Sequence, residues 1–510
     1  MSGHRSPSRR WTIGGFLIAA AAIVAWFVFH IADLGGRPLT IAWGFDPAVY
    51  DPQRTSNPVA YEVFRHVCEP LFWEDQSGDL RGWLAEDDVA YSEDDRQLII
   101  RLRPDIYFHD GEPLTPAAVV QSFRRLQTLQ ASPLTPLLDG VQFEALDDER
   151  SVRITLPIPD YEYPRRVLAN AYSGILSPRT TPETRFVACT GPYQFDQERY
   201  KPNQSITLPR FASYHHMLPE GDKPIKVRIP EVEILFEADA EQRLRQLENG
   251  RICVLSLDDP AEAAQLESEE RFHTYNAWGG ITYLGFNFLS PTWQNTDARR
   301  AVAQAVDSQA LAISDAFVSA DTIFTPPANG YNERAAAYRI PYNPAQSAAL
   351  LSDLSPLQAR RITLLAADSP IHRRFAQEIQ GQLHAVGIDV TVQAVPYAEI
   401  IAGRHAYDLL LFDYAWWDYT AVAAFLGPGP RNLLAYPESD AAELIFHALG
   451  TADAQARQDV LLQLQKLIAD KVIWKPLVMR RLSVVVDGRC VQGEITTRFG
   501  ELYFHTAATQ

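Results

Sequence analysis

The amino-acid sequence predicts an α/β protein of more than one domain, preceded by a single transmembrane helix. Three observations lead to this prediction. The chain has 510 residues, which is too long for one compact core. Residues 362–412 read as strand, helix, strand, helix and strand, a pattern typical of a parallel sheet with crossover helices. An uncharged run from Trp11 to Ala32 has the length that a helix needs to cross a bilayer.

The amino-terminal run is flanked in a way that predicts its orientation. Arg5, Arg9 and Arg10 precede it, and basic residues before a transmembrane helix keep the N-terminus in the cytoplasm. The run ends in the bulky segment 27–30 rather than in small residues. We therefore expect an uncleaved anchor and keep a cleaved signal peptide, which would leave a free periplasmic protein, as the alternative.

Composition excludes several classes of protein. Apolar residues make up 46% and charged residues 21% of the chain, which excludes a disordered chain, a collagen and a multi-span membrane protein. The net charge is −17, and because residues 1–37 hold four Arg and one Asp, a net +3, the exported part carries −20. Since phosphate backbones require a basic binding face, we expect no nucleic-acid partner.

Four cysteines lie far apart in the sequence: Cys68, Cys189, Cys253 and Cys490. No C-x-x-C pair occurs, which excludes a zinc ribbon and a thioredoxin-type motif. One or two disulfides are expected in an exported protein. Buried free thiols are the alternative, and the sequence leaves the pairing open.

The exported part begins with strands and one well-marked helix. Residues 39–43 read as a strand, and residues 97–103 alternate apolar and polar side chains as another strand. Thr115 followed by Pro116 is typical of a helix start, with threonine as the N-cap and proline in the first turn.

The clearest fold signal lies in the second half of the chain. Residues 362–366, 388–394 and 407–412 read as strands. Between the first two, apolar residues recur every four positions on a helix that stops at Gly387. A short helix is expected over residues 397–403. Right-handed crossovers would make the three strands parallel.

The connection that leaves the third strand, residues 413–419, is the candidate ligand site. It contains two tryptophans (Trp416 and Trp417), two tyrosines and two carboxylates (Asp413 and Asp418). In open parallel sheets, ligands bind beyond the carboxyl ends of the strands. The alternative is that the two tryptophans only cover the core of the sheet.

Five short motifs then occur in a fixed order along the chain. They are residues 107–115, 190–193, 283–287 and 297–307 and the pair Asp418–Tyr419. They resemble, in turn, an F-H-D-G-x-P-L-T turn, a T-G-P-Y turn, a strand ending in F-N, a helix with A-I-x-x-A-I-D, and a D-Y pair in the ligand cleft. All five are features of the extracellular solute-binding proteins that deliver oligopeptides, dipeptides or nickel chelates to ABC importers. The resemblance covers nearly all of residues 38–510.

The resemblance implies a two-lobed periplasmic-binding-protein-like fold (class II, cluster C) with an extra inserted domain, preceded here by the transmembrane helix. Residues 38–75, 188–277 and 480–510 would form lobe I, residues 76–187 the inserted domain, and residues 278–479 lobe II. The lobes would be joined by two crossing strands, Trp278–Phe288 and Trp474–Val486. Closure of the lobes over a ligand would be a hinge motion.

The resemblance also implies how a ligand would be held. Asp418 would pair with the ammonium end of a peptide, because an ion pair shielded from water is stronger than an exposed one. Other ligand-site residues are expected to be aromatic: Trp416, Trp417, Tyr419, Tyr283 and Trp278 on the same side, and Tyr50 and Phe45 on the opposite lobe. For Tyr50 and Phe45 a core role is equally compatible with the sequence.

The sequence gives little support for an enzymatic function. No G-x-S-x-G, H-E-x-x-H or Walker-type motif occurs, and we expect no catalytic residue, cofactor or bound metal. We interpret His109–Asp110 as a structural hydrogen-bonding turn, and His215–His216 as part of a loop rather than as metal ligands.

The functional prediction is the substrate-binding component of an ABC importer for peptides. It would act as a monomer with permease subunits on the periplasmic side of the bacterial inner membrane. A receptor for a nickel chelate or another small solute is the first alternative. A membrane-tethered sensor or scaffold, suggested by the uncleaved anchor, is the second, and a hydrolase on the same scaffold is the third.

Overall fold

The computed structural model describes residues 36–509, except for residues 56, 76, 130–131, 215–226, 258–259, 313, 355–360, 404, 416–417, 428–431, 494, 498–499 and 506. The transmembrane helix expected at residues 11–32 lies outside this part, as do His215–His216 and Trp416–Trp417. Within the described residues, no helix has both the length and the apolar character needed to span a membrane.

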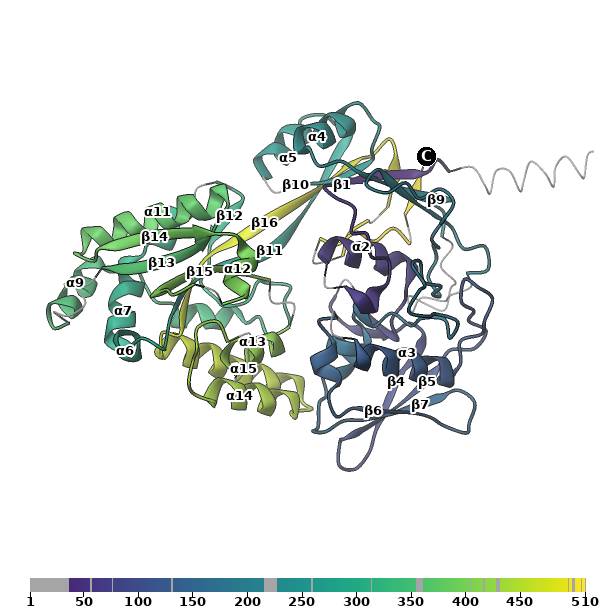
Figure 1. Ribbon diagram of the computed structural model, residues 1–510, viewed down its shortest axis with the longest axis horizontal. Helices are drawn as coiled ribbons and strands as arrows, with labels where there is room; N and C mark the ends of the chain where they lie inside the picture. The colour runs from purple at the N-terminus through teal and green to yellow at the C-terminus, as the bar shows by residue number, and fades with distance from the viewer. Residues whose placement is uncertain are drawn as a thin grey trace, which may run out of the picture.

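The described chain forms two lobes connected by two long strands (Figure 1). The connecting strands are β11 (Phe272–Phe286) and β16 (Trp474–Asp487). We call the elements before β11, together with the tail after β16, the N-terminal lobe, and the elements between β11 and β16 the C-terminal lobe.

The N-terminal lobe has two parts. The first is built on β1 (Leu39–Trp43), β8 (Ser205–Pro209), β9 (Glu231–Phe236) and β10 (Val254–Leu257), with helices α2 (Pro58–Val67), α4 (Ala240–Glu248) and α5 (Pro260–Glu267) and the tail hairpin β17 (Val491–Gln492) and β18 (Ala508–Thr509). The second is a four-stranded sheet of β4 (Ala85–Tyr91), β5 (Gln97–Leu102), β7 (Ser151–Thr155) and β6 (Gln142–Ala145), next to the small hairpin β2 (Phe72–Glu74) and β3 (Leu80–Gly82).

The sequence-predicted elements of the N-terminal lobe are confirmed. Residues 39–43 form β1 and residues 97–102 form β5. Helix α3 (Pro116–Thr128) begins as expected, because the Thr115 hydroxyl accepts a hydrogen bond from the Ala118 N–H and Pro116 stands in the first turn. Its buried face, which includes Val119, Phe123 and Leu126, packs on the four-stranded sheet.

The C-terminal lobe contains the predicted parallel unit. Strands β13 (Ile362–Ala367), β14 (Val390–Val395) and β15 (Leu409–Tyr414) are parallel, with β13 in the middle. Helices α11 (Pro370–Ala385) and α12 (Tyr397–Ile401) connect them. The remaining elements are α6 (Pro291–Gln294), α7 (Thr296–Ala305), α8 (Ser308–Leu311), β12 (Phe317–Ser319), α9 (Pro344–Ser352), α13 (Thr420–Leu426), α14 (Asp440–Leu449) and α15 (Ala454–Asp470).

One ten-stranded sheet runs through both lobes in the order β14-β13-β15-β11-β16-β10-β1-β9-β8, with β12 paired to β16 beside this path. β11 and β16 are antiparallel along their length. Their register shifts between Trp278 and Ile281, where β11 contains Gly279 and Gly280. A β-carbon on Gly280 would stand 3.0 Å from the Tyr414 carbonyl oxygen, so the bulge depends on a residue without a side chain.

Both disulfides lie in the N-terminal lobe and account for all four cysteines. Cys68 pairs with Cys189, and Cys253 pairs with Cys490. The first bond joins the end of α2 to the T-G-P-Y turn, and the second joins β10 to the tail that follows β16. The structure therefore settles the choice that the sequence left open, in favour of two disulfides over free thiols.

Candidate functional site

Asp418 lies where the two lobes meet. It follows β15 and forms an isolated parallel bridge with Asn329. Its carboxylate accepts hydrogen bonds from the Thr420 N–H at 2.6 Å and from the Asn329 side-chain amide at 3.3 Å. The side-chain amide of Asn329 also donates to Glu162 of the N-terminal lobe at 2.6 Å. One amide thus links Asp418 to the opposite lobe.

Further polar contacts between the lobes surround this link. Arg457 on α15 pairs with Glu162 at 2.8 Å, and the Tyr161 N–H donates to the Leu449 carbonyl at 3.0 Å. On the N-terminal lobe, Arg166 pairs with Asp160. We call these residues the interlobe cluster: Asp160, Glu162, Arg166, Asn329, Asp418 and Arg457.

Burial dominates the electrostatics of the interlobe cluster. It raises the pKa of the Asp418 carboxyl, while hydrogen bonding from Thr420 and the nearby Arg166 guanidinium act in the opposite direction. Burial also raises the pKa of Glu162, and Arg457 and Arg165 oppose that shift. Because a cation stabilises a partly desolvated carboxylate, Asp418 is suited to receive a positively charged group of a ligand.

The predicted aromatic residues differ in how exposed they are in the structure. Phe45 is 50% exposed, and Trp278 is half-buried with the Arg481 guanidinium 5.3 Å from its ring centre. Both therefore retain surface that a ligand could contact. Trp416 and Trp417 lie outside the described residues, so their expected role stays a prediction.

Three predicted tyrosines have to be corrected, because the structure buries them completely: Tyr50, Tyr283 and Tyr419. The Tyr283 hydroxyl donates to the Ile323 carbonyl at 2.7 Å, and its ring stacks on Phe412 in the core of the C-terminal lobe. Tyr50 packs on Phe186 and donates its hydroxyl to Asp46 at 2.7 Å. Burial leaves these rings no surface for a ligand.

A second polar group stands at the carboxyl edge of the parallel strands. Asp413, at the end of β15, lies 2.9 Å from Nε2 of His372 in the first turn of α11. Nδ1 of His372 is 2.7 Å from the hydroxyl of Ser369, the N-cap of that helix. Tyr397, the first residue of α12, follows β14, which β13 separates from β15 in the sheet. These are the strand ends at which the topology predicts ligand binding.

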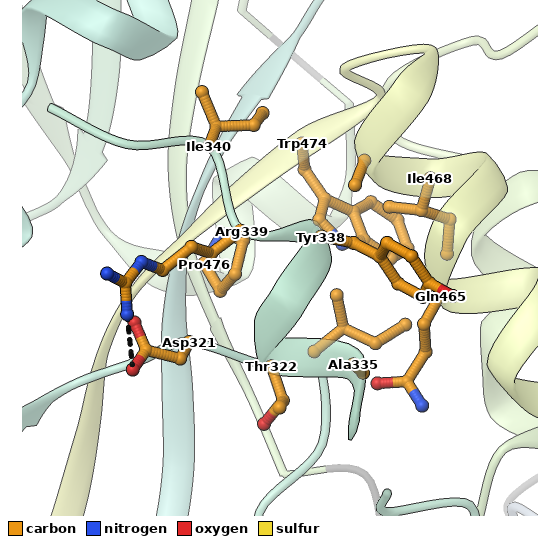
Figure 2. Close-up of a pocket in the computed structure, with 12 residues that line it drawn as sticks. Asp321, Thr322, Ala335, Tyr338, Arg339, Ile340, Gln465, Ile468, Trp474 and Pro476 are labelled. Carbon is orange, nitrogen blue, oxygen red and sulfur yellow. Dashed lines mark hydrogen bonds and ion pairs between the residues drawn. The ribbon is translucent and has the colours of Figure 1, made fainter. Parts of the chain in front are cut away.

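Two hollows elsewhere in the C-terminal lobe do not involve the predicted residues. A cavity of ≈ 20 Å³ lies beside Trp474, Tyr338 and Gln465, under the Asp321–Arg339 ion pair (Figure 2). It has room for little more than a water molecule. A shallower hollow of ≈ 590 Å³ runs along α14 and α15, lined by side chains of both charges such as Asp440, Glu443, Lys466 and Lys471.

The turn around His109 has the structural role that we predicted. Nε2–H of His109 donates to the Gly191 carbonyl at 2.9 Å, and Nδ1 accepts from the Cys189 N–H at 3.3 Å. The histidine thereby ties the F-H-D-G turn to the T-G-P-Y turn. Burial lowers the pKa of its imidazole to about 4, although the hydrogen bond to Gly191 opposes the shift.

Sequence reasoning missed most of the interlobe cluster. Glu162, Arg166, Asn329 and Arg457 lie outside the five motifs and far from Asp418 in the sequence. No local spacing marks them, since their proximity arises only when the lobes come together. His372 carried a weak signal, because it stands in the first helical turn after a strand whose carboxyl end was expected to face a ligand.

Comparisons with known proteins agree on one family and one fold. The sequence model for bacterial extracellular solute-binding proteins, family 5 (Middle), matches residues 79–429, more than half of the chain. A probable D,D-dipeptide-binding periplasmic protein of Escherichia coli is 24% identical over 88% of this chain and 90% of its own length. Heme-binding protein A of Haemophilus influenzae is 22% identical over 90% of this chain and 88% of its own length.

A solved structure shows the same fold. The ABC transporter substrate binding protein CtaP from Listeria monocytogenes superposes with a TM-score of 0.79 at 21% sequence identity. The superposition covers 93% of this chain and 99% of that protein. At this level of identity the comparison supports the two-lobed architecture rather than a particular ligand.

Proposed function

Because the chain belongs to the bacterial extracellular solute-binding proteins of family 5, we propose that it is the substrate-binding component of an ABC importer. It captures peptides between its two lobes and delivers them to a membrane permease. The observation that supports this most directly is the position of Asp418. Its partly desolvated carboxylate is linked through Asn329 to Glu162 of the opposite lobe, so an ammonium group bound there would be enclosed as the lobes close.

The proposed mechanism is a hinge motion about the crossing strands. The Gly279–Gly280 bulge of β11 lies at the point where pairing with β15 begins, since Ile281 pairs with Tyr414. Glycines and a register shift lower the cost of bending a strand there. Closure would surround the ligand ammonium with Asp418, place its chain beside Trp278, Phe45, Trp416 and Trp417, and exclude water from the ion pair.

Within this function we propose the class II, cluster C arrangement with an inserted domain. Lobe I comprises residues 38–75, 188–277 and 480–510, the inserted domain residues 76–187, and lobe II residues 278–479. The register shift supports the boundary near residue 278 in β11, and the facing pairs Trp278–Arg481 and Ile281–Met479 support the boundary near residue 480 in β16.

The family is periplasmic, and we propose that a membrane anchor retains the protein there. The uncharged run from Trp11 to Ala32 serves as a helical anchor in the inner membrane. Only residues 33–38 separate this run from β1, so the anchor holds a monomeric receptor close to the permease.

A receptor for another small solute is the second candidate. It is favoured by the range of ligands in the names of the relatives, which include a dipeptide-binding and a heme-binding protein. A tethered sensor that binds the same ligands would differ in its membrane partner.

Native mass spectrometry of the full chain, purified from its native membrane in mild detergent, tests the proposal. We expect a series of additional masses that fragment as peptides, together with importer subunits in a crosslinked sample. A bound metal chelate or porphyrin would support the second candidate instead. A receptor that remains empty after exposure to a peptide mixture would contradict peptide capture.

A further inference from the structure

The carboxyl edge of β13, β14 and β15 presents a second negative group, Asp413, in addition to Asp418. Asp413 lies within β15 and Asp418 on the connection that follows it, and the two have different surroundings. Asp418 belongs to the interlobe cluster, whereas Asp413 contacts His372 in the first turn of α11. Figure 1 shows α12 on the side of the C-terminal lobe that is turned toward the N-terminal lobe.

His372 fixes the orientation of the Asp413 carboxylate. The Ser369 hydroxyl accepts the backbone N–H of His372 at 3.3 Å and lies 2.7 Å from Nδ1 of its ring. Nε2 of the same ring lies 2.9 Å from Oδ2 of Asp413. The imidazole is thereby held between the N-cap of α11 and the carboxylate.

The second oxygen of Asp413 is not engaged. Oδ1 is buried and has no hydrogen-bond partner among the described residues, whereas Oδ2 lies against Nε2 of His372. The Asp413 side chain is nevertheless 44% exposed. Because Oδ1 is buried, this exposed surface belongs to the other atoms of the side chain, which include Oδ2. A carboxylate oxygen that one neighbour holds in place can accept a further hydrogen bond from a cation.

An exposed aromatic ring lies within electrostatic range of this carboxylate. Tyr397 is 46% exposed, and burial together with the charge of Asp413 raises the pKa of its hydroxyl. The face of an exposed tyrosine attracts ammonium and guanidinium groups. Asp413 and Tyr397 therefore offer the two contacts by which a basic side chain is usually recognised.

We propose that Asp413, oriented by His372, forms together with Tyr397 a subsite for a lysine or arginine side chain of the bound peptide. This inference rests on the proposed peptide-binding function and specifies the substrate class as basic peptides. The α-ammonium group binds at Asp418 and the basic side chain at Asp413. The net charge of −20 on the chain after residue 37 attracts such ligands from a distance.

The test is a calorimetric comparison of peptides that differ only in charge. The full-length protein in detergent is titrated with Ala-Arg-Ala and Ala-Ala-Arg and with the same peptides carrying citrulline, the uncharged analogue of arginine. An all-alanine tripeptide reports peptide binding itself. We expect one arginine peptide to bind about tenfold more tightly than its citrulline analogue, the range for a charged hydrogen bond with a cation–π contact.

Two variants and one control variant identify which residues cause the preference for the arginine peptide. In Asp413→Asn the arginine preference should disappear while affinity for the citrulline peptide is unchanged. Tyr397→Leu should reduce the preference severalfold. Asp368→Asn is the matched control, because it removes an equal charge from the same sheet edge, where Asp368 pairs with Arg373, and it should keep the full preference. Thermal unfolding of each variant shows whether it is folded.

The possible results separate the two proposals. Equal affinities for arginine and citrulline peptides, or a preference that persists in folded Asp413→Asn, would overturn the subsite while leaving peptide capture intact. Failure of the wild-type protein to bind any of the peptides, the all-alanine one included, would overturn peptide capture and the subsite with it.

Discussion

Arg457 on α15 and Glu162 of the N-terminal lobe form an ion pair across the two lobes, with Nη2 and Oε1 2.8 Å apart. Glu162 also accepts the Asn329 amide at 2.6 Å, so a single carboxylate holds two residues of the opposite lobe. Both side chains of the ion pair are largely buried, and salt screens such pairs less than exposed ones. The contact therefore favours the approach of the lobes before any ligand binds.

Removing this ion pair should open the unliganded protein. In Arg457→Ala, buried Glu162 loses its closest cation but keeps Arg165 at 3.3 Å. The cost is therefore less than the roughly 3 kcal/mol of leaving a buried charge without a partner. We expect a larger radius of gyration in small-angle X-ray scattering of the ligand-free protein, and a return toward the wild-type value on adding ligand. Arg334→Ala, which breaks the exposed pair with Asp459, is the control. Identical scattering of Arg457→Ala and wild type would show that the ion pair does not hold the lobes.

Asp418 should be the residue whose charge matters most for peptide affinity. Asp418→Asn keeps the shape of the side chain and the hydrogen bond from Thr420, but removes the charge that an ammonium group needs. We expect peptide affinity to fall at least tenfold, the effect of losing a charged hydrogen bond, with little change in thermal stability. N-acetylated peptides, which lack the ammonium group, should bind wild type and variant equally. If acetylation leaves affinity for the wild-type protein unchanged, Asp418 is not the ammonium site.

Each of the two disulfides should stabilise the N-terminal lobe against unfolding. Each bond joins segments that are far apart in the sequence, with separations of 121 and 237 residues, and closing such long loops restricts the unfolded chain strongly. Replacing Cys68 and Cys189 by serine should lower the free energy of unfolding by about 3 kcal/mol. Urea unfolding with and without a reducing agent measures this. The reductant should have a smaller effect on the variant, because one of its two targets is gone, and an equal effect on both proteins would contradict the pairing.

His109 should make the protein less stable as the pH falls below neutrality. The pKa of the folded imidazole is about 4, whereas a histidine in an unfolded chain takes up a proton near pH 6.5. Between these values the unfolded state binds more protons, so the free energy of unfolding decreases as the pH decreases. From pH 7 to pH 5 this amounts to about 2 kcal/mol.

His109→Gln isolates this contribution. Glutamine can still hydrogen-bond in the turn but does not titrate. Buried His66, whose pKa is also lowered by burial and by His505, contributes equally to both proteins and cancels in the comparison. Urea unfolding at pH 7 and pH 5 should therefore show a smaller loss of stability in the variant. A variant that loses as much stability as the wild type would show that His109 does not account for the pH dependence.

Local sequence patterns predicted the helices and strands well where the spacing of apolar residues stayed regular over the whole element. The apolar stripe between residues 371 and 383 and the strands on either side of it gave the parallel unit β13-α11-β14-α12-β15. Thr115 and Pro116 marked the start of α3 for the same reason, because a helix cap depends on neighbours in the sequence. The β11–β16 crossing followed from the family resemblance, although β11 begins earlier, at Phe272, than the motif suggested.

The candidate site was predicted only in part. Asp418 and Asp413 were singled out because they lie at or after the end of a strand whose carboxyl edge is expected to face a ligand, and their role in binding stays a prediction. Tyr283 was misassigned, since an aromatic residue in a strand has the same sequence signature whether its ring faces a cleft or the core. Tyr50 lies after the end of β1, in a segment whose sequence does not show which way the ring points. Glu162 and Arg457 could not be identified, because they are separated from Asp418 by helices and whole lobes and carry no motif of their own.

The α/β class, the parallel unit and the family follow from the sequence alone, as does the choice of Asp413 in β15 and Asp418 beyond it as candidate site residues. These depend on residue periodicity and short motifs, which are properties of neighbouring positions. The tertiary structure decided the disulfide pairing, the burial of the tyrosines and the contact of Glu162 with Asn329 and Arg457. Each of these depends on which distant segments are brought together and which side chains lose water, and those outcomes are set by the packing of the whole chain.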